Sequence, residues 1–325
     1  DQSPVSDEEL RAMLSAIMSE TDRARWAEHG DADWAWEVPG LSRFRCNAGM
    51  DRRGPMAVIR VIPTTIQTAE QLGLSAEVQK LCSLTKGLVL VTGPTGSGKS
   101  TTLAGMIDLV NRTRKDHILT IEDPIEFVHQ NQSSLITQRQ VGIHTRSFKA
   151  ALRAALREDP DVVLVGEMRD LETVSTAIET AETGHLVFGT LHTTTAASTI
   201  DRIIDQFPPD QQSQVRVMLA ESLRGVVSQV LCRRKGGGRV AAREVLIAMP
   251  AISNLIREGK TFQIPTIMQT NRKAGMTTLT DALLQLVDED LIEPEEAWLK
   301  SIEKSAMLSA LRTRRHDTGF AESAA

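Results

Sequence analysis

The stretch Gly93–Ser100 reads GPTGSGKS and matches the phosphate-binding loop pattern G-x-x-x-x-G-K-[ST] at every fixed position. In this pattern the glycines let backbone N–H groups face phosphate, and the lysine reaches the β- and γ-phosphates. The closing hydroxyl ligates Mg²⁺. These roles fall to Lys99 and Ser100. The residues expected to contact the phosphates are Gly93, Pro94, Thr95, Gly96, Ser97, Gly98, Lys99, Ser100 and Thr101.

The segments on either side of this loop support the same interpretation. Gly87–Thr92 is an apolar run typical of a buried strand, and 101–110 has no proline and predicts a helix. A strand, a glycine loop and a helix together aim backbone donors and a positive helix end at phosphate. The alternative, a chance glycine turn on the surface, leaves those flanking elements unexplained.

Acidic residues follow two further predicted strands. Ile118–Ile121 runs into a segment with three carboxylates, of which Glu126 is the last. Val162–Val165 is followed by a glycine and Glu167, which resembles a Walker B sequence with Glu where Asp is usual. Open α/β sheets bind ligands at the carboxyl ends of their strands. One acid there can act on an attacking water and another can hold Mg²⁺, although the first segment also fits an acidic solvated loop.

Two histidines bracket a fourth predicted strand, 186–191. His185 precedes it and His192 follows it, beside several threonines. A lone histidine is more often a structural hydrogen-bonding residue, but this pair predicts a polar sensor of the γ-phosphate. No Cys/His spacing indicates a metal-binding motif.

The segment 1–62 predicts a small α+β domain. Ser6 and Glu9 form a capping box before one helix, and three alternating runs between 31 and 62 predict an antiparallel meander. A solvated sheet face explains any single arginine there. As a cluster they also suit phosphate recognition, including by a finger from a neighbouring subunit. The candidates are Arg43, Arg45, Arg53 and Arg60.

The rest of the chain predicts a linker at 63–74, a strand–helix core at 75–248 and a helical part at 249–325. Within the core, 211–232 predicts one long amphipathic helix, and 233–239 predicts a solvated hairpin turn. Helices are expected at 252–258, 279–287 and 295–304. The fold class is therefore α/β, with a small α+β domain in front.

Composition limits the remaining possibilities. At 325 residues and 41% hydrophobic content, the length favours a globular chain of about two domains. The net charge of −5 gives no overall basic field that would favour nucleic acid. No apolar run is long enough to span a membrane, and no signal peptide is visible. Three separated cysteines suit buried thiols in a cytosolic protein.

In this order the motifs resemble the secretion ATPase superfamily, and within it the ATPases that retract type IV pili. The phosphate loop, the acidic box 121–126, the Walker B segment 161–170 and the histidine box 183–193 carry the resemblance. The strand 40–47 is similar to an arginine-bearing strand of the family. The segment 251–258 is similar to a C-terminal motif, with Ser253 in place of an arginine.

The resemblance implies a homohexamer of subunits with a PAS-like N-terminal domain, here without its first strands, and a RecA-like ATPase domain. ATP and Mg²⁺ would bind between the domains. Glu126 is expected to act on water and Glu167 to hold Mg²⁺ with Ser100, although spacing does not exclude the reverse. His192 or His185 would sense the γ-phosphate. The implied partner is the inner-membrane pilus platform, which places a cytoplasmic protein peripherally at that membrane.

Several alternatives stay open. Assembly and type II secretion ATPases often carry a tetracysteine insertion, and only Cys232 follows the nucleotide site here, which favours retraction. An accessory, paralogous pilus ATPase is harder to separate. Of other classes, the net charge disfavours a RecA-like nucleic-acid motor. The intact Lys99, Ser100, Glu126 and Glu167 disfavour a factor that binds nucleotide without hydrolysing it.

Overall fold

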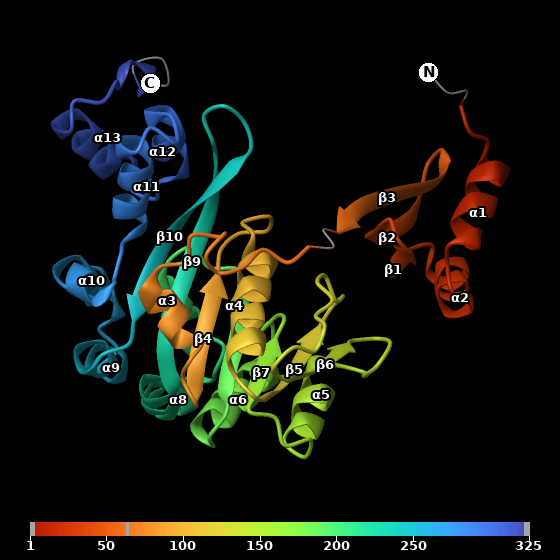
Figure 1. Ribbon diagram of the computed structural model, residues 1–325, viewed down its shortest axis with the longest axis horizontal. Coiled ribbons are helices and arrows are strands. Elements are labelled where there is room, and N and C mark those ends of the chain that lie inside the picture. Colours follow the sequence, from red (N-terminus) through yellow and green to blue (C-terminus); the bar gives the residue numbers. More distant parts are fainter. Residues whose placement is uncertain (1–3, 63–64, 322–325) are drawn as a thin grey trace. The chain divides into compact units, whose positions relative to one another are not determined.

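The structure, a computed structural model, describes residues 4–62 and 65–321 and divides into two compact units (Figure 1). The first comprises Asp1–Ile66 with Pro124–Val128, and the second Gln67–Asp123 with His129–Ala325. Of the predicted linker 63–74, the part from Gln67 onward belongs to the second unit, where Ala69 and Leu74 are buried. Positions 63 and 64 lie outside the described residues.

The N-terminal unit packs two helices on a three-stranded meander. Its elements are α1 (Asp7–Ala16), α2 (Glu20–His29), β1 (Ala32–Val38), β2 (Ser42–Asp51) and β3 (Gly54–Ile62). The capping box and the antiparallel order β1-β2-β3 are confirmed. The expectation of a single helix was wrong. Helix α2 has its own caps at Ser19 and Gly30. It was missed because it has few apolar residues besides Trp26, so its sequence shows no clear helical period.

The second unit is built on a seven-stranded sheet in the order β10-β9-β4-β8-β7-β5-β6. Its strands are β4 (Gly87–Thr92), β5 (His117–Glu122), β6 (Leu135–Gln140), β7 (Val162–Val165), β8 (Leu186–Leu191), β9 (Leu223–Arg233) and β10 (Arg239–Ile247). All neighbouring strands are parallel except β10 beside β9. This confirms the predicted parallel sheet, and all these parallel strands end at one edge. Sequence patterns missed β6, an edge strand whose residues are mostly polar.

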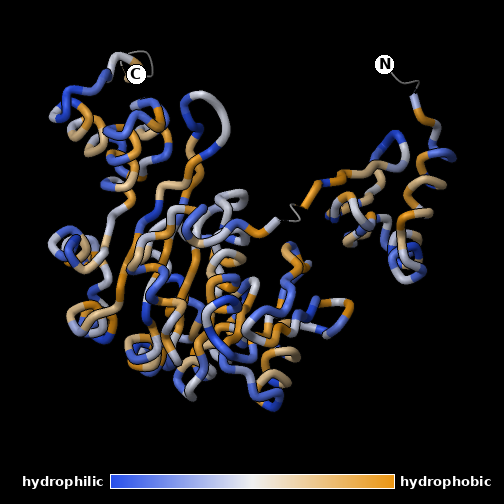
Figure 2. Tube along the Cα trace, in the orientation of Figure 1, coloured by the Kyte–Doolittle hydropathy of each residue, from blue (hydrophilic) through white to orange (hydrophobic). Residues whose placement is uncertain are grey.

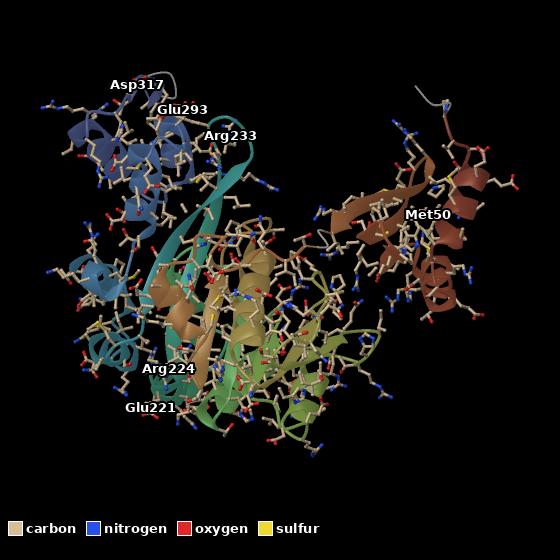
Figure 3. The ribbon with its side chains drawn as sticks, in the orientation of Figure 1. Met50, Glu221, Arg224, Arg233, Glu293 and Asp317 are labelled. Carbon is tan, nitrogen blue, oxygen red and sulfur yellow. The ribbon has the colours of Figure 1, made fainter. Side chains whose placement is uncertain are left out.

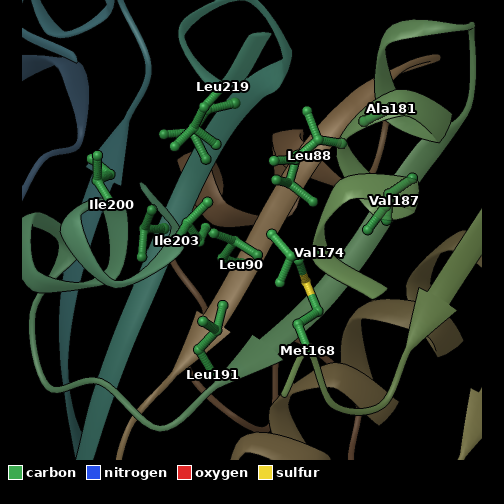
Figure 4. Close-up of a cluster of buried hydrophobic side chains, with 14 of the residues drawn as sticks. Leu88, Leu90, Met168, Val174, Ala181, Val187, Leu191, Ile200, Ile203 and Leu219 are labelled. Carbon is green, nitrogen blue, oxygen red and sulfur yellow. The ribbon is translucent and has the colours of Figure 1, made fainter. Parts of the chain in front are cut away.

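Helices cover both faces of the sheet. One face carries α3 (Ala76–Leu81) and α4 (Lys99–Thr113), and the other carries α5 (Phe148–Ala155), α6 (Leu171–Glu182), α7 (Ala196–Ile204) and α8 (Pro209–Ser222). Successive residues of β4 point to opposite faces. Leu88 and Leu90 pack against α6, α7 and α8 (Figure 4), and Val89 and Val91 against α4.

The predicted helix 211–232 was wrong in its second half. Helix α8 ends at Ser222 and β9 begins at Leu223. The Arg224 guanidinium donates to the Glu221 carbonyl at this junction, 2.6 Å away (Figure 3). Segment 223–232 lies buried between β4 and β10, where β-branched side chains pack well, so strand pairing overrides the helical period. The predicted hairpin turn is confirmed, with three glycines at positive φ at a hydrophilic to neutral tip (Figure 2).

The C-terminal part is helical, as predicted. It contains α9 (Pro250–Arg257), η1 (Thr261–Gln263), α10 (Ile264–Thr270), η2 (Arg272–Ala274), α11 (Leu279–Asp288), α12 (Pro294–Lys300), α13 (Lys304–Thr313) and η3 (Gly319–Ala321). The predicted helix 295–304 is in fact interrupted. Ser301 is extended, and the Lys304 ammonium donates to the Trp298 and Leu299 carbonyls that end α12. No helix in the described part of the chain is long and apolar enough to cross a membrane.

Candidate nucleotide site

The phosphate loop connects β4 to α4 at the carboxyl edge of the sheet. Gly93 has φ +143°, and a Cβ there would meet the Gln229 carbonyl at 2.3 Å and the Ser97 hydroxyl at 2.5 Å. Gly98 is the N-cap of α4 at φ +87°. Both positions therefore require glycine. The loop leads directly into the amino end of α4, where helix N–H groups converge as phosphate binding requires.

A chain of side chains crosses this edge from the phosphate loop to the Walker B acid. The Lys99 ammonium donates to the Gly93 carbonyl at 2.8 Å and lies 3.4 Å from Nδ1 of His192. Nε2 of the same imidazole lies 2.8 Å from Oε1 of Glu167. An ammonium can only donate, so Nδ1 accepts and Nε2 carries the proton that it donates to Glu167. Lys99 and Glu167 are 68 positions apart in the sequence, where only motif analogy related them. In the structure His192 connects them directly.

Glu167 remains a carboxylate in this setting. Burial raises the pKa of its carboxyl, but the hydrogen bond and charge of Arg169, 2.5 Å away, together with the hydrogen bond from His192, outweigh burial and lower the pKa below its ordinary value. The next residue, Asp170, caps α6 through the Thr173 N–H. An ionised acid that is 19% exposed in its side chain suits a metal-holding role.

The oxygens near the loop fit Mg²⁺. Ser100 is exposed in the first turn of α4, and its hydroxyl makes no hydrogen bond within the described residues. No group of three or more His, Cys, Asp or Glu side chains in that part of the chain gathers into a metal site. The exposed Ser100 hydroxyl suits an ion held by one hydroxyl, one carboxylate such as Glu167, water and the nucleotide's own phosphates. Ser100 and Glu167 are the residues that would hold it.

Gln229 of β9 is a site residue that sequence reasoning missed. Its side-chain N–H donates to the Ser97 carbonyl at 2.6 Å, and its Oε1 accepts from the Thr102 hydroxyl at 2.8 Å. The side chain is 1% exposed, so both bonds are made away from water. Gln229 therefore fastens the loop to α4. The incorrect helix prediction for 211–232 hid the signal, which is a buried amide side chain in a mostly apolar strand.

The acidic box divides between the two units. Glu122 ends β5 and accepts from the Thr120 hydroxyl at 2.6 Å and the Gln138 amide at 3.1 Å. Glu126 belongs to the N-terminal unit, where its carboxylate lies 3.9 Å from the Arg45 guanidinium and is 38% exposed. Glu122 thus has a structural set of partners, whereas Glu126 keeps an accessible carboxylate.

The other candidate arginines lie in the same unit as Arg45. Arg43 and Arg45 belong to β2 and Arg60 to β3, directly opposite Arg45, while Arg53 is in the β2–β3 turn. All are partly or fully exposed. The sheet brings Arg45 and Arg60 together, and Arg53 lies at the far end of the hairpin from them.

The assignment of His185 as a γ-phosphate sensor needs correction. In the parallel register Leu186 pairs with Gly87, the first residue of β4, so His185 lies at the amino edge of the sheet. His192 lies beyond the other end of β8, beside the loop. Nδ1 of His185 lies 3.1 Å from the Thr180 carbonyl of α6. Residues that bracket a strand necessarily lie at opposite edges, so only one of the two reaches the phosphates.

A cavity of about 430 Å³ opens beside the first turn of α4. Gly98 and Thr101 line its phosphate-loop side, and Gln67, Gln71 and Arg243 line the remainder with the β9–β10 hairpin. Burial lowers the pKa of the Arg243 guanidinium to about 10, and its Nε has no hydrogen-bond partner among the described residues. The cavity thus combines cationic and apolar side chains and is continuous with the phosphate loop.

A parallel sheet with a phosphate loop, a Walker B acid and a histidine linking them defines a P-loop ATPase. The family model for "Type II/IV secretion system protein" matches residues 41–237, and the chain belongs to that family. It is an ATP hydrolase that uses ATP with Mg²⁺.

Known relatives are similar over most of the chain. The type IV pilus retraction ATPase PilT of Pseudomonas aeruginosa is 53% identical over 90% of this chain and 86% of that protein. A twitching motility protein of Neisseria gonorrhoeae is also 53% identical, over 90% and 79%. The crystal structure of the pilus retraction motor PilT with bound ADP superposes with a TM-score of 0.85 at 50% identity, over 91% of this chain and 84% of that one.

Proposed function

We propose that this protein is the motor that retracts type IV pili, a cytoplasmic homohexamer that works against the inner-membrane pilus platform. The observation that carries the proposal is its similarity to a pilus retraction ATPase across nearly the whole chain. The chain from Lys99 through His192 to Glu167 supports it chemically, because a motor must relate the state of its nucleotide to the rest of the subunit.

Phosphoryl transfer needs charge neutralisation and an aligned water rather than covalent chemistry. Lys99 supplies one positive charge to the phosphates, and the N–H groups at the start of α4 supply partial charges. Ser100 and Glu167 would hold Mg²⁺, which would supply further positive charge to the phosphates. When phosphate replaces the loop carbonyls as partner of Lys99, the bond between Lys99 and His192 changes, so His192 registers whether the γ-phosphate is there.

Glu126 is the proposed acceptor of the proton from the attacking water. Its side chain is 38% exposed and its carboxylate lies 3.9 Å from Arg45, whereas hydrogen bonds from Thr120 and Gln138 hold Glu122. Glu167 takes the metal because it is ionised and bound to His192. Arg43, Arg45, Arg53 and Arg60 are proposed as donors to phosphate from the subunit itself or from its neighbour in the ring.

The cavity beside α4 is the proposed place of the ribose and base. Its residues begin at Gly98 and Thr101, where the α-phosphate side of a nucleotide leaves a phosphate loop. The Arg243 guanidinium and the amides of Gln67 and Gln71 offer donors for the ring nitrogens and hydroxyls.

The proposal is tested in two steps. First, the mass of the purified protein and its ATP turnover are measured, with Glu126→Gln beside it. We expect a hexamer whose turnover falls at least 10²-fold in the variant. Second, the gene is introduced into a twitching bacterium that lacks its retraction ATPase, with Glu126→Gln as the inactive control. Restored twitching by the wild type alone supports retraction. Restored twitching only when the host's own retraction ATPase is also present would assign the chain to the accessory paralogues.

The nucleic-acid motor is tested in the same assay. Adding single-stranded DNA should leave turnover unchanged, in keeping with the net charge of −5. A several-fold rise in turnover with DNA would overturn the pilus proposal.

A further inference from the structure

One buried carboxylate outside the nucleotide site binds two helices at once. Glu244 of β10 is 7% exposed. One of its oxygens, Oε1, accepts from the Ala196 N–H at 2.7 Å, and Oε2 accepts from the Leu279 N–H at 3.0 Å. Ala196 and Leu279 are the first residues of α7 and α11. No salt bridge joins Glu244 to a cation in the part of the chain that the structure describes. The two helix amino ends take the place of a cation.

Helix α7 leads directly to the nucleotide site. It starts four residues after His192, and Thr195 is its N-cap. In its first turn the Thr199 hydroxyl lies 2.7 Å from the Thr193 hydroxyl and 3.4 Å from that of Thr92, the residue just before the phosphate loop. The position of this first turn therefore fixes the segment that carries His192.

Helix α11 leads to the helical C-terminal part. It packs with α12, α13, the end of β9 and the start of β10 in a separate hydrophobic cluster. The backbone of Val245, next to Glu244, exchanges two hydrogen bonds with Thr277, of 2.8 and 3.0 Å. The start of α11 is thus held at β10 by two backbone bonds and the Glu244 carboxylate.

We propose that Glu244 is a positioning residue for ATP hydrolysis, which holds α7, and through it His192, in register with α11. The inference rests on the ATPase activity and on the sensor role of His192 proposed above. If the His192 segment moves when nucleotide binds, α11 moves with it, because Glu244 is bonded to both helices. The C-terminal helices sense the nucleotide through this anchor, and they influence His192 in return, since such coupling is reciprocal.

The chemistry of the anchor requires a carboxylate. A glutamine offers a single acceptor oxygen, and its NH₂ would face the second helix N–H as a donor facing a donor. An aspartate is shorter by one methylene and reaches one helix at most. Glu244→Gln keeps the volume of the side chain and removes one of the two bonds, so it is the informative substitution.

The test compares two buried glutamates. Glu296 of α12 is 5% exposed and also accepts a backbone N–H, that of Arg233, at 2.9 Å, so Glu296→Gln is the matched control for general loss of stability. In the assembled protein we expect Glu244→Gln to lower kcat about tenfold, with little change in the Kd for ADP. We expect Glu296→Gln to keep kcat within about twofold.

A double variant separates positioning from simple destabilisation. If Glu244 acts through His192, Glu244→Gln combined with His192→Ala has the kcat of His192→Ala alone, because the residues then act as a unit. If the kcat losses of the two single variants multiply in the double variant, the inference is overturned. Equal kcat losses in Glu244→Gln and the Glu296 control would also overturn it. The unaltered protein gives an independent measurement if variants fail to fold. On addition of a non-hydrolysable ATP analogue, hydrogen exchange at the starts of α7 and α11 should change together.

A change confined to α7 in that exchange experiment would also overturn the coupling. These results are distinguishable from failure of the proposed function. Absence of ATP turnover in the wild type would undermine the motor itself, whereas normal turnover with independent helices would remove only the anchor.

Discussion

The two edges of the central sheet carry similar residues and use them differently. At the carboxyl edge the His192 imidazole bonds to both Lys99 and Glu167. At the amino edge His117 contacts Asp161, Thr137 and the Glu158 carbonyl, and His185 contacts the Thr180 carbonyl. The amino-edge histidines tie strand ends to neighbouring segments. Among the described residues it is at the carboxyl edge that a strand end meets a glycine loop and a helix amino end, so ligand binding is expected there.

The largest expected difference between the edges lies in two lysines that flank β4. Lys99→Ala removes the charge that meets the β- and γ-phosphates, and we expect ATP turnover to fall about 10³-fold. Lys86 precedes the other end of the same strand and is exposed. Lys86→Ala should leave turnover within about twofold. Turnover is measured by phosphate release at saturating ATP, and comparable losses in both variants would break the distinction between the edges.

The second contrast uses the two histidines that bracket β8. His192→Ala breaks the link between Lys99 and Glu167, and we expect kcat to fall about 10²-fold with folding retained. His185→Ala removes one hydrogen bond to the Thr180 carbonyl, so it should cost about 1 kcal/mol of stability and leave kcat unchanged. Kinetics and urea unfolding are measured for both. A His185 variant as inactive as the His192 variant would restore the rejected assignment.

The histidine pair also shows how far sequence reasoning reaches. The phosphate loop, the Walker B acid and the strands β4, β7 and β8 follow from local patterns, because glycine spacing and apolar runs are fixed by local backbone and burial needs. The edge to which a residue belongs depends on strand direction and register. The sequence order His185–strand–His192 contained that information, since a strand separates its two ends.

Other misses have non-local causes. Segment 223–232 has apolar residues that suit a helix or a strand, and its burial between β4 and β10 decides the outcome. Gln229 and Glu244 become site-related only through pairings with Ser97 and Ala196, far away in the chain. No pattern within either segment encodes those partners.

The next prediction tests how Gln229 holds the phosphate loop at the carboxyl edge. Gln229→Glu keeps an acceptor for the Thr102 hydroxyl but faces the Ser97 carbonyl with an oxygen instead of a donor. Loss of a buried hydrogen bond costs about 1–3 kcal/mol, so we expect the Kd for ADP to rise about tenfold. Gln285→Glu, on the exposed face of α11, introduces the same charge as a control. Equal ADP affinity in both variants would contradict a clamping role. Titration calorimetry measures the affinity.

The last comparison concerns a fourth histidine, whose expected effect is on stability rather than on turnover. Burial lowers the pKa of His129 to about 4, although the charge of Asp108 acts in the opposite direction. Its backbone N–H donates to Gln138, whose amide also donates to Glu122. An unfolded histidine takes up a proton near pH 6.5 and the folded one does not, so stability is full above pH 6.5 and falls as the pH drops toward 4.

Between pH 7 and pH 5 this one group should cost about 2 kcal/mol of unfolding free energy. His129→Gln has no such proton to gain, so its stability relative to the wild type should rise by that amount over the same interval, as measured by urea unfolding at both pH values. A constant difference between variant and wild type would mean that His129 titrates in the folded protein as it does in the unfolded chain. The interior of the acidic box would then be open to water, and Glu122 would be as accessible as Glu126, which removes the structural reason for preferring Glu126 as the residue that acts on water.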